Sequence, residues 1–382
     1  MSYQLQGNLV TPSGVFYGTI VLEGNCITSV SPQAAEAKTG ADYILPGFIE
    51  LHLHGTGPYT SETAEGVAGM ATYSPAKGTT RFCPTLCCAH NDFYRKLLPE
   101  INALRLSNPP GSVIDCVYIE GPWVSLPFKG GMHADLIHPL TNAEADEILA
   151  LAPGLVKIMA IAPEEPGALD FIRHMTSKGV VMSLAHSACK PEDFPAAVEA
   201  GIRQMTHLFD AYDVPVSLNG VRQPALTDMG LIDDRVMKEV IMDGKHVPPE
   251  LVRLAIRAAG VDHILSITDA LQGAGMSHCR FQDMGTWYHI ENEGDLALVE
   301  EDGSIVGSSL TQNMAFFNLV TKFGVTPRDA SRMLSANQAK VLGLAGKTGE
   351  LLPGLQADVT VLAADCRTVK ACFVQGKAEF QA

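Results

Sequence analysis

Eight short apolar runs recur along the chain, and this repetition restricts the possible folds more than any other feature of the sequence. Each run ends in a polar residue or in a Gly or Pro break, and the runs do not alternate strictly between apolar and polar residues. Such runs are typical of strands that are covered on both faces, as in a parallel sheet. They lie at 44–51, 80–86, 113–119, 155–162, 180–185, 203–209, 236–242 and 263–268.

The segments between these runs carry the signals of helices. Residues 191–200 begin with Pro and end before Gly201, and residues 248–259 begin with two Pro residues and end before Gly260. Pro at the first turn and Gly just past the last turn are the expected punctuation of a helix. A further helix is predicted over 326–344.

Alternating strands and helices predict an α/β fold with a parallel sheet, and eight such units predict closure into a (β/α)8 TIM-type barrel. An open, doubly wound sheet is the alternative, but no GxGxxG motif follows a strand, which disfavours it. Residues 1–45 and 346–382 contain short β-like pieces and turns, and neither end is long enough to bury a core alone. We therefore expect the two ends to form one small β-sandwich-like domain beside a barrel domain at 46–345.

Charge and hydropathy exclude several classes of partner. The chain has 27 Lys and Arg against 42 Asp and Glu, a net charge of -15, so its surface repels phosphate backbones and no nucleic-acid partner is expected. No window reaches about 18 consecutive apolar residues, so no membrane span is expected. The chain shows no basic start followed by an apolar stretch, so no secretory signal is expected. A cytoplasmic location follows from these expectations.

The cysteines do not resemble a disulfide framework. There are nine, an odd number, in a large chain without a CxxC pair. Cys83, Cys87 and Cys88 lie in an apolar, strand-like run, where we interpret them as reduced thiols in the core.

Chemically active residues follow the predicted strands. Because the carboxyl ends of the strands of a barrel meet at one face, residues far apart in sequence would share one pocket there. These residues are His52, His54, Glu120, His186, His207, Asp243, His246 and Asp269.

The residue types in this set suit a metal ion. His52 and His54 are two positions apart on a strand, so their side chains point to the same side and can hold one ion. A lone HxH pair is weak evidence, because neutral histidines also occur in polar cores, but the joint pattern is stronger. Imidazole and carboxylate groups bind Zn²⁺ and similar ions. Glu120, after an apolar strand, is a ligand or a charge at a helix N-terminus, and a cation would offset its burial.

Asp269 at the end of the eighth run has two interpretations. It is either a helix N-cap, which Asp favours, or a general base near a water activated by the metal. We favour the base. Lys157 lies inside the fourth run, and a carboxylated Lys there is less favoured because Glu120 already supplies a carboxylate. Glu164, beside Glu165, is interpreted as a structural residue.

The chain resembles the N-acetylglucosamine-6-phosphate deacetylase family of the amidohydrolase superfamily, nearly along its whole length and in order. The matching segments are PGFIELHLHG (46–55), YIEGPW (118–123), KGGMH (129–133), AHSAC (185–189), THLFDA (206–211), VRQPAL (221–226), MDGKHV (242–247), ITDA (267–270), SIVGSSLT (304–311) and GELLPGLQADVTVL (349–362).

The resemblance implies a (β/α)8 barrel flanked by a β domain from both termini, usually in a homodimer. It implies Glu120, His186 and His207 as metal ligands, with His52 and His54 able to hold a second ion, and Asp269 as the catalytic acid and base. The ion would be Zn, with Fe, Co or Mn as alternatives. The substrate side would include Met132, His133, Asp210, Ala211, Arg222, His246 and the covering loop Ile305, Val306 and Gly307, with His133 and His246 near the sugar or amide oxygen and Ala211 and Arg222 near the phosphate.

Departures from the family pattern concentrate around the sugar and phosphate. Asp210 stands where the family has Asn, Trp123 where it has Phe, and Met132 where it has Ala, and the stretch 212–220 is longer than usual. A carboxylate 4 Å from a phosphate charge is repelled by about 1 kcal/mol even in bulk water. The departures bear on the substrate more than on the reaction type.

The leading hypothesis is metal-assisted removal of the acetyl group from an N-acetylhexosamine 6-phosphate, with the gluco and galacto sugars both open. A second hypothesis, which Asp210 favours, is another N-acyl or cyclic-amide hydrolase of the superfamily that acts on an unphosphorylated substrate. A third is a non-catalytic scaffold, which would lack ligands, whereas every expected ligand is present.

Overall fold

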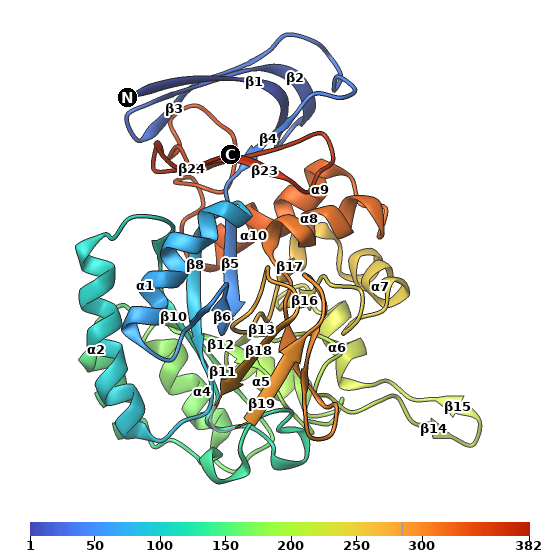
Figure 1. Ribbon diagram of the computed structural model, residues 1–382. Coiled ribbons are helices and arrows are strands. Elements are labelled where there is room, and N and C mark those ends of the chain that lie inside the picture. The colour runs from blue at the N-terminus through green and yellow to red at the C-terminus, as the bar shows by residue number, and fades with distance from the viewer. Residues whose placement is uncertain (284–285) are drawn as a thin grey trace.

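Eight parallel strands form a barrel in the computed structural model, which describes residues 1–283 and 286–382 (Figure 1). The strands follow one another in the order β17-β16-β13-β12-β11-β10-β8-β5, so each is a neighbour of the next along the chain. They are β5 (Phe48–Leu53), β8 (Thr79–Leu86), β10 (Val117–Glu120), β11 (Val156–Ile161), β12 (Val181–Leu184), β13 (Ile202–Met205), β16 (Met237–Ile241) and β17 (Ile264–Ile267). Each of the eight predicted runs overlaps a barrel strand, and the predicted fold class is confirmed.

The barrel closes between its first and last strands at their carboxyl ends. The backbone N–H of Asp269 donates to the carbonyl of His52 at 3.0 Å, and the N–H of His54 donates to the carbonyl of Ala270 at 2.7 Å. The closing contact therefore lies among the residues that follow β5 and β17, where three of the predicted site residues are found.

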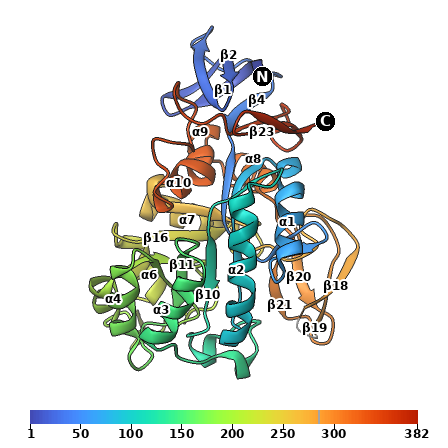
Figure 2. The ribbon, with the colours of Figure 1, turned by 90° about the vertical axis from the view of Figure 1, so that its left-hand side faces the viewer.

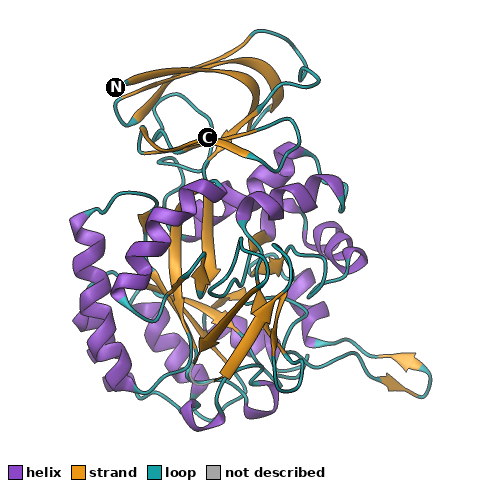
Figure 3. Ribbon diagram, in the orientation of Figure 1, coloured by secondary structure: helices purple, strands orange, loops and turns teal. Residues whose placement is uncertain are grey.

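Helices surround the strands on the outside of the barrel (Figure 3). Their order along the chain alternates with that of the strands, as the Pro and Gly signals predict. They are α1 (Ala64–Tyr73), α2 (Asn91–Ser107), α3 (Asn142–Leu151), α4 (Ala168–Ser177), α5 (Phe194–Ala200), α6 (Leu226–Ile232), α7 (Pro249–Ala259), α8 (Gln312–Thr321), α9 (Pro327–Ser331) and α10 (Asn337–Val341), with short turns η1 (Ser74–Lys77), η2 (Leu126–Phe128), η3 (Ala134–Leu136), η4 (Val261–His263) and η5 (Arg332–Ala336).

The helix predicted over 326–344 is present with one irregularity. A π-helical turn, η5, joins α9 to α10, so the segment is a continuous coil whose hydrogen-bond pattern widens in the middle. Thr326 caps its start by accepting a hydrogen bond from the N–H of Asp329. Within the described part of the chain, no helix is both long and apolar enough to span a bilayer.

Strands from both ends of the chain form one seven-stranded sheet at the amino-terminal side of the barrel (Figure 2). The order is β24-β23-β22-β4-β1-β2-β3, and the parallel pair β1 and β4 lies between antiparallel hairpins. The strands are β1 (Ser2–Thr11), β2 (Gly14–Glu23), β3 (Cys26–Pro32), β4 (Tyr43–Pro46), β22 (Val359–Leu362), β23 (Val369–Val374) and β24 (Lys377–Gln381). The expectation that both termini share one β unit is confirmed, while its boundaries at 45 and 346 stay a prediction.

Two β additions to the barrel were not predicted. A four-stranded sheet is inserted after β17, and a hairpin after β13 projects far from the barrel (Figure 1). The inserted sheet consists of β18 (Cys279–Asp283), β19 (Thr286–Ile290), β20 (Leu296–Val299) and β21 (Ile305–Ser308), and the hairpin of β14 (Ser217–Leu218) and β15 (Val221–Arg222). Shorter pieces are β6 (Gly55–Thr56), β7 (Tyr59–Thr60) and β9 (Val113–Ile114).

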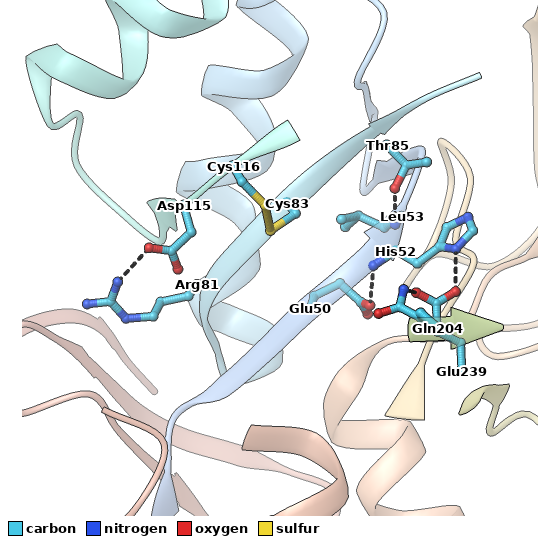
Figure 4. Close-up of a disulfide and its surroundings, with 10 residues drawn as sticks. All are labelled: Glu50, His52, Leu53, Arg81, Cys83, Thr85, Asp115, Cys116, Gln204 and Glu239. Carbon is cyan, nitrogen blue, oxygen red and sulfur yellow. Dashed lines mark hydrogen bonds and ion pairs between the residues drawn. A yellow bond between two sulfur atoms is a disulfide. The ribbon is translucent and has the colours of Figure 1, made fainter. Parts of the chain in front are cut away.

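One expectation about the cysteines is wrong. Cys83 is not a reduced thiol but forms a disulfide with Cys116 (Figure 4), whereas Cys87 and Cys88 are outside the disulfide, as expected. Cys83 lies on β8 and Cys116 directly precedes β10, and the pairing of these strands brings the two Cα atoms to 4.9 Å. The two residues are 33 positions apart, so their proximity depends on the strand order and leaves no local signal.

A buried guanidinium joins the barrel to the terminal sheet. Arg81 on β8 is 3% exposed. Its Nε donates to Asp358 at 2.7 Å, its Nη1 donates to Asp115 at 2.8 Å, and its Nη2 donates to Gln356. Asp358 and Gln356 directly precede β22, so the contact ties the two parts of the molecule together. The side chain of Thr348 completes the cluster by donating to Asp358.

Replacing Arg81 should destabilise the protein strongly. Arg81→Met leaves Asp358 and Asp115 buried without their cation, and breaking such a pair costs about 3–5 kcal/mol. Arg95→Met is the matched control, because Arg95 pairs with Glu147 at the surface and its loss should cost at most about 1 kcal/mol. Urea unfolding followed by circular dichroism measures both. Equal unfolding midpoints for the two variants would contradict this role of Arg81.

Candidate functional site

Five predicted ligands and the predicted base come together at the carboxyl ends of the barrel strands. They come from five strands that are spread along the sequence, and each follows or ends its strand. His52 and His54 belong to the end of β5, Glu120 is the last residue of β10, and His186, His207 and Asp269 follow β12, β13 and β17. The predicted convergence therefore takes place at the expected face of the barrel.

Glu120 and two histidines form the first group of ligand atoms. Oε1 of Glu120 lies 3.2 Å from Nε2 of His186 and 3.0 Å from Nε2 of His207. The two Nε2 atoms are themselves 3.1 Å apart. All three residues are buried, so water does not screen the group. These three atoms are close enough together to coordinate one ion.

The second oxygen of Glu120 faces the histidines of β5. Its Oε2 lies 3.1 Å from Nε2 of His54 and 3.6 Å from Nε2 of His52. Oδ1 of Asp269 lies 3.4 Å and 3.5 Å from the same two nitrogens. The Glu120 carboxylate thus stands between two pairs of imidazoles, with Asp269 beside one pair.

The outer nitrogens of two of these rings contact backbone carbonyls. Nδ1 of His186 is 2.8 Å from the carbonyl of Phe128, and Nδ1 of His207 is 3.2 Å from that of Asp210. A carbonyl only accepts hydrogen bonds, so Nδ1 carries the proton in both rings. In the neutral ring, Nε2 then presents a lone pair to the centre of the group, as a metal ligand requires.

The electrostatics of the group favour positive charge at its centre. Burial lowers the pKa of His54, but hydrogen bonds to Asp269 and Glu120 outweigh it and raise the pKa to about 9. Burial likewise lowers the pKa of His207, and its bond to Glu120 raises it to about 9. For Glu120, burial raises the pKa, but the charge of His52 and the bonds from His186 and His207 take it well below its usual value.

This donor set fits a divalent cation. Two imidazole Nε2 atoms face each other at 3.1 Å, and Nε2 of His52 and His54 face each other at 3.3 Å, with carboxylate oxygens next to both pairs. Nitrogen lone pairs at such distances repel unless a proton or a metal ion lies between them. Histidine with one or two carboxylates is a ligand set of catalytic zinc and related metal sites.

The backbone is held in the left-handed region at three of these residues. His186, His207 and Asp269 have φ of 45°, 30° and 47°. This conformation is uncommon for residues other than Gly and persists where the surrounding structure enforces it, often at functional sites. Each of the three residues is the second one after a barrel strand. For Asp269, burial raises the pKa and the bond from His54 lowers it to a net value below the usual range.

Among the predicted substrate residues, His246 has a buried ring nitrogen that a substrate could bind. Its Nδ1 is 2.6 Å from Asp243, while its Nε2 is buried without a hydrogen-bond partner among the described residues. His133 precedes η3 and is half-buried. Met132 is buried beside Cys88, with their sulfur atoms 3.2 Å apart. A substrate group that hydrogen-bonds Nε2 of His246 would satisfy this atom.

Arg222 does not lie beside the other residues of this chain's site. It belongs to the projecting β14–β15 hairpin, its side chain is 61% exposed, and it pairs with Asp228. Asp210 and Ala211, by contrast, lie three and four residues after His207 and are half-buried.

Asp210 also contributes to the electrostatics of His246. Burial lowers the pKa of His246, whereas the bond to Asp243 and, more weakly, the charge of Asp210 raise it.

The residues expected to form a covering loop are in a strand instead. Ile305, Val306 and Gly307 belong to β21, the edge of the inserted sheet. The strand is fixed to the site because the N–H of Ser308 donates to the carbonyl of Asp269 at 3.0 Å. Gly307 has φ of 148°, and a Cβ there would meet the Asp269 carbonyl at 3.0 Å, so Gly is required for this close approach.

Sequence reasoning missed the residues that support the site from inside the barrel. Asp243 was noticed at a strand end but not linked with His246, and Glu239 on β16, which contacts His52, lies within an apolar run. Glu239 differs from its neighbours only in the side of the strand to which its side chain points, because successive side chains point to opposite faces. Lys157, also within a strand, is exposed on the outside of the barrel, and Glu164 accepts hydrogen bonds from Ser187 and Ala188.

Comparison with known proteins gives a consistent result. Residues 43–378 match the profile of the amidohydrolase family. An N-acetylgalactosamine-6-phosphate deacetylase from Escherichia coli O157:H7 is 31% identical over 92% of this chain and 92% of its own length. An N-acetylglucosamine-6-phosphate deacetylase from Bacillus subtilis (strain 168) is 28% identical over 88% of this chain and 85% of its own. A mutant N-acetyl-D-glucosamine-6-phosphate deacetylase from Mycobacterium smegmatis, in complex with N-acetyl-D-glucosamine-6-phosphate, has a TM-score of 0.90 at 26% identity, and 100% of each chain is covered.

Loss of the central carboxylate should remove bound metal. Glu120→Ala takes away the group that both pairs of imidazoles share, so we expect little or no zinc per chain after purification in a zinc-containing buffer. Glu50→Gln is the matched control, because Glu50 is also buried in the barrel but bonds to the backbone of His52 and to Gln312. Elemental analysis measures the metal. Full occupancy in Glu120→Ala would show that this carboxylate holds no ion.

Proposed function

This chain belongs to the amidohydrolase family, and from that membership we propose that it removes the acetyl group from an N-acetylhexosamine 6-phosphate. The family is metal-dependent, and the relatives that match nearly the whole chain are deacetylases of amino sugar phosphates. The proposed products are acetate and the free amino sugar phosphate. The gluco and galacto sugars are both named among the relatives, and we take N-acetylglucosamine 6-phosphate as the first substrate to test.

The observation that carries the proposal is the placement of Glu120 between two imidazole pairs with Asp269 beside them. We propose that Glu120, His186 and His207 hold a divalent cation, and that His52 and His54 can hold a second. Zinc is the first candidate, with iron, cobalt and manganese as alternatives. When bound, such an ion polarises an amide carbonyl and lowers the pKa of water.

Asp269 is the proposed acid and base of the reaction. Its carboxylate would accept a proton from the attacking water and return it to the leaving amine. The bond from His54 holds the pKa of Asp269 below its usual range, so the carboxylate is ionised at neutral pH. The left-handed backbone and the contact with β21 hold it in place, so the proton acceptor does not have to be ordered when the substrate binds.

The remaining groups would bind and orient the sugar. Nε2 of His246, buried and without a partner, is suited to the amide oxygen or a hydroxyl group. His133 and Met132 would line the same side, with β21 covering the substrate through Ile305, Val306 and Gly307. Gly131 approaches Val306 closely, so the segment before His133 packs against β21.

We further propose a homodimer whose projecting hairpin reaches the partner. The hairpin exposes Val214, Val216, Leu218 and Val221, each at least 58% exposed, which is costly for apolar side chains in water. Arg222 on β15 is a suitable phosphate ligand because its guanidinium matches phosphate geometry. Apart from the Cys83–Cys116 pair, the cysteines of the described residues form no disulfide, which suits a reducing compartment, and we place the protein in the cytoplasm.

One observation favours a second candidate substrate class. Asp210 follows His207 and would repel a phosphate placed beside it, whereas a hydroxyl or amine would donate to its carboxylate. An N-acyl hydrolase for an unphosphorylated substrate is therefore the alternative within the same family.

Acetate release from a substrate panel separates these candidates. We expect activity on N-acetylglucosamine 6-phosphate or N-acetylgalactosamine 6-phosphate, and loss of a factor of about 10² or more in kcat/KM without the phosphate, because a charge-assisted phosphate contact is then missing. An enzyme-coupled acetate assay measures the rates. Faster turnover of the unphosphorylated sugars would favour the alternative.

Replacing the proposed base should remove turnover but not metal. Asp269→Asn keeps the shape of the side chain and loses the proton acceptor, so kcat should fall by about 10²–10⁴-fold while the metal content stays near that of the wild type. Glu291→Gln, on the exposed inserted sheet, is the control and should keep full activity. A fully active Asp269→Asn variant would show that the base has been assigned wrongly.

A further inference from the structure

A buried carboxylate lies behind His52, on the side of the imidazole that faces away from the candidate cation site. Oε2 of Glu239 is 3.0 Å from Nδ1 of His52, and both side chains are fully buried (Figure 4). Glu239 belongs to β16 and His52 to β5, and in the barrel β17 lies between these strands at the closing seam. The contact therefore crosses the interior of the barrel, beneath the site.

A second side chain fixes the orientation of this carboxylate. Nε2 of Gln204 on β13 donates to Oε1 of Glu239 at 2.5 Å, as Figure 4 shows. An ionised carboxylate can only accept hydrogen bonds, so the other oxygen must accept from Nδ1–H of His52. The proton of the neutral ring is then on Nδ1, and Nε2 presents its lone pair toward His54 and Glu120.

Glu239 pairs with His52 and with no Lys or Arg of the described residues. The neighbouring Lys238 donates instead to the carbonyl of Asp233. A buried charge is costly unless it is paired. Positive charge can reach Glu239 through the imidazole of His52. A cation at Nε2 of His52 would therefore stabilise the buried Glu239 carboxylate, and Glu239 would in turn stabilise the bound cation.

We propose that Glu239, held by Gln204, is a positioning residue that fixes the tautomer of His52 and strengthens its Nε2 as a metal ligand. Carboxylates that accept a hydrogen bond from a metal-bound histidine orient the ring and raise its basicity. The inference rests on the proposed function, because it requires that His52 contacts a metal ion. It adds that the affinity for this ion is set from inside the barrel, by residues that touch neither metal nor substrate.

Two variants at this position separate hydrogen bonding from charge. Glu239→Leu removes the acceptor, so nothing fixes the proton on Nδ1. Glu239→Gln removes the charge but can keep an acceptor for His52, because Oε1 of Gln204 has no partner and a rotated Gln204 amide can accept the new N–H. Glu50→Gln is the control, since Glu50 contacts the backbone of His52 rather than its ring.

The experiment measures zinc and cobalt affinity and the histidine tautomer in the full chain. Metal is removed with a chelator, each ion is titrated back in competition with a chromophoric chelator, and ¹⁵N-histidine NMR of the zinc-loaded protein reports which nitrogen of His52 carries the proton. We expect Glu239→Leu to weaken binding of the ion held by His52 and His54 by about 10–100-fold and to give mixed tautomers of His52. Glu239→Gln should weaken it less and keep the Nδ1–H tautomer, and Glu50→Gln should match the wild type.

The outcomes distinguish the inference from the proposed function. If the wild-type protein binds no metal, the proposed function fails. If it binds metal and both Glu239 variants match it in affinity and tautomer, only the positioning role is overturned. If Glu239→Leu does not fold, Glu239→Gln decides alone. Weaker ion binding by a Glu239→Gln variant whose circular dichroism spectrum is intact supports the positioning role, and an unchanged affinity overturns it.

Discussion

The carboxylate of Glu120 is the point on which the candidate site depends. Its two oxygens face two different pairs of imidazoles, and each pair brings nitrogen atoms to about van der Waals contact or closer. Such a group is costly to bury unless positive charge joins it. Because Glu120 ends β10 while the imidazoles come from β5, β12 and β13, no local segment can build this arrangement. The closed barrel is what places the five residues around one centre.

The backbone around this centre adopts uncommon conformations that position the side chains. His186, His207 and Asp269 leave their strands in the left-handed region, and Gly307 allows β21 to hydrogen-bond directly beside Asp269. The cost of these conformations is offset by the packed barrel beneath them, which is covered on both faces. In this respect the site and the closing seam between β5 and β17 are one structure.

The two ends of the proposed substrate have different supports. The acetamide end of the proposed substrate would face a group of buried residues from a single chain, at the carboxyl ends of the barrel strands. The phosphate end would rely on Arg222, which lies on an exposed hairpin, and would meet the carboxylate of Asp210.

The sequence by itself determined the eight strands, the main helices and the residues at the strand ends. These signals are local: apolar runs, Pro and Gly at helix ends, and polar residues where a strand stops. Only the tertiary structure decided that Cys83 meets Cys116, that Arg222 points away from its own site, that residues 305–307 form a strand, and that Glu239 supports His52 across 187 positions. Each of these depends on strand order, register and the facing of a side chain. A single misplaced strand would change all of them while leaving every local pattern in the sequence unchanged.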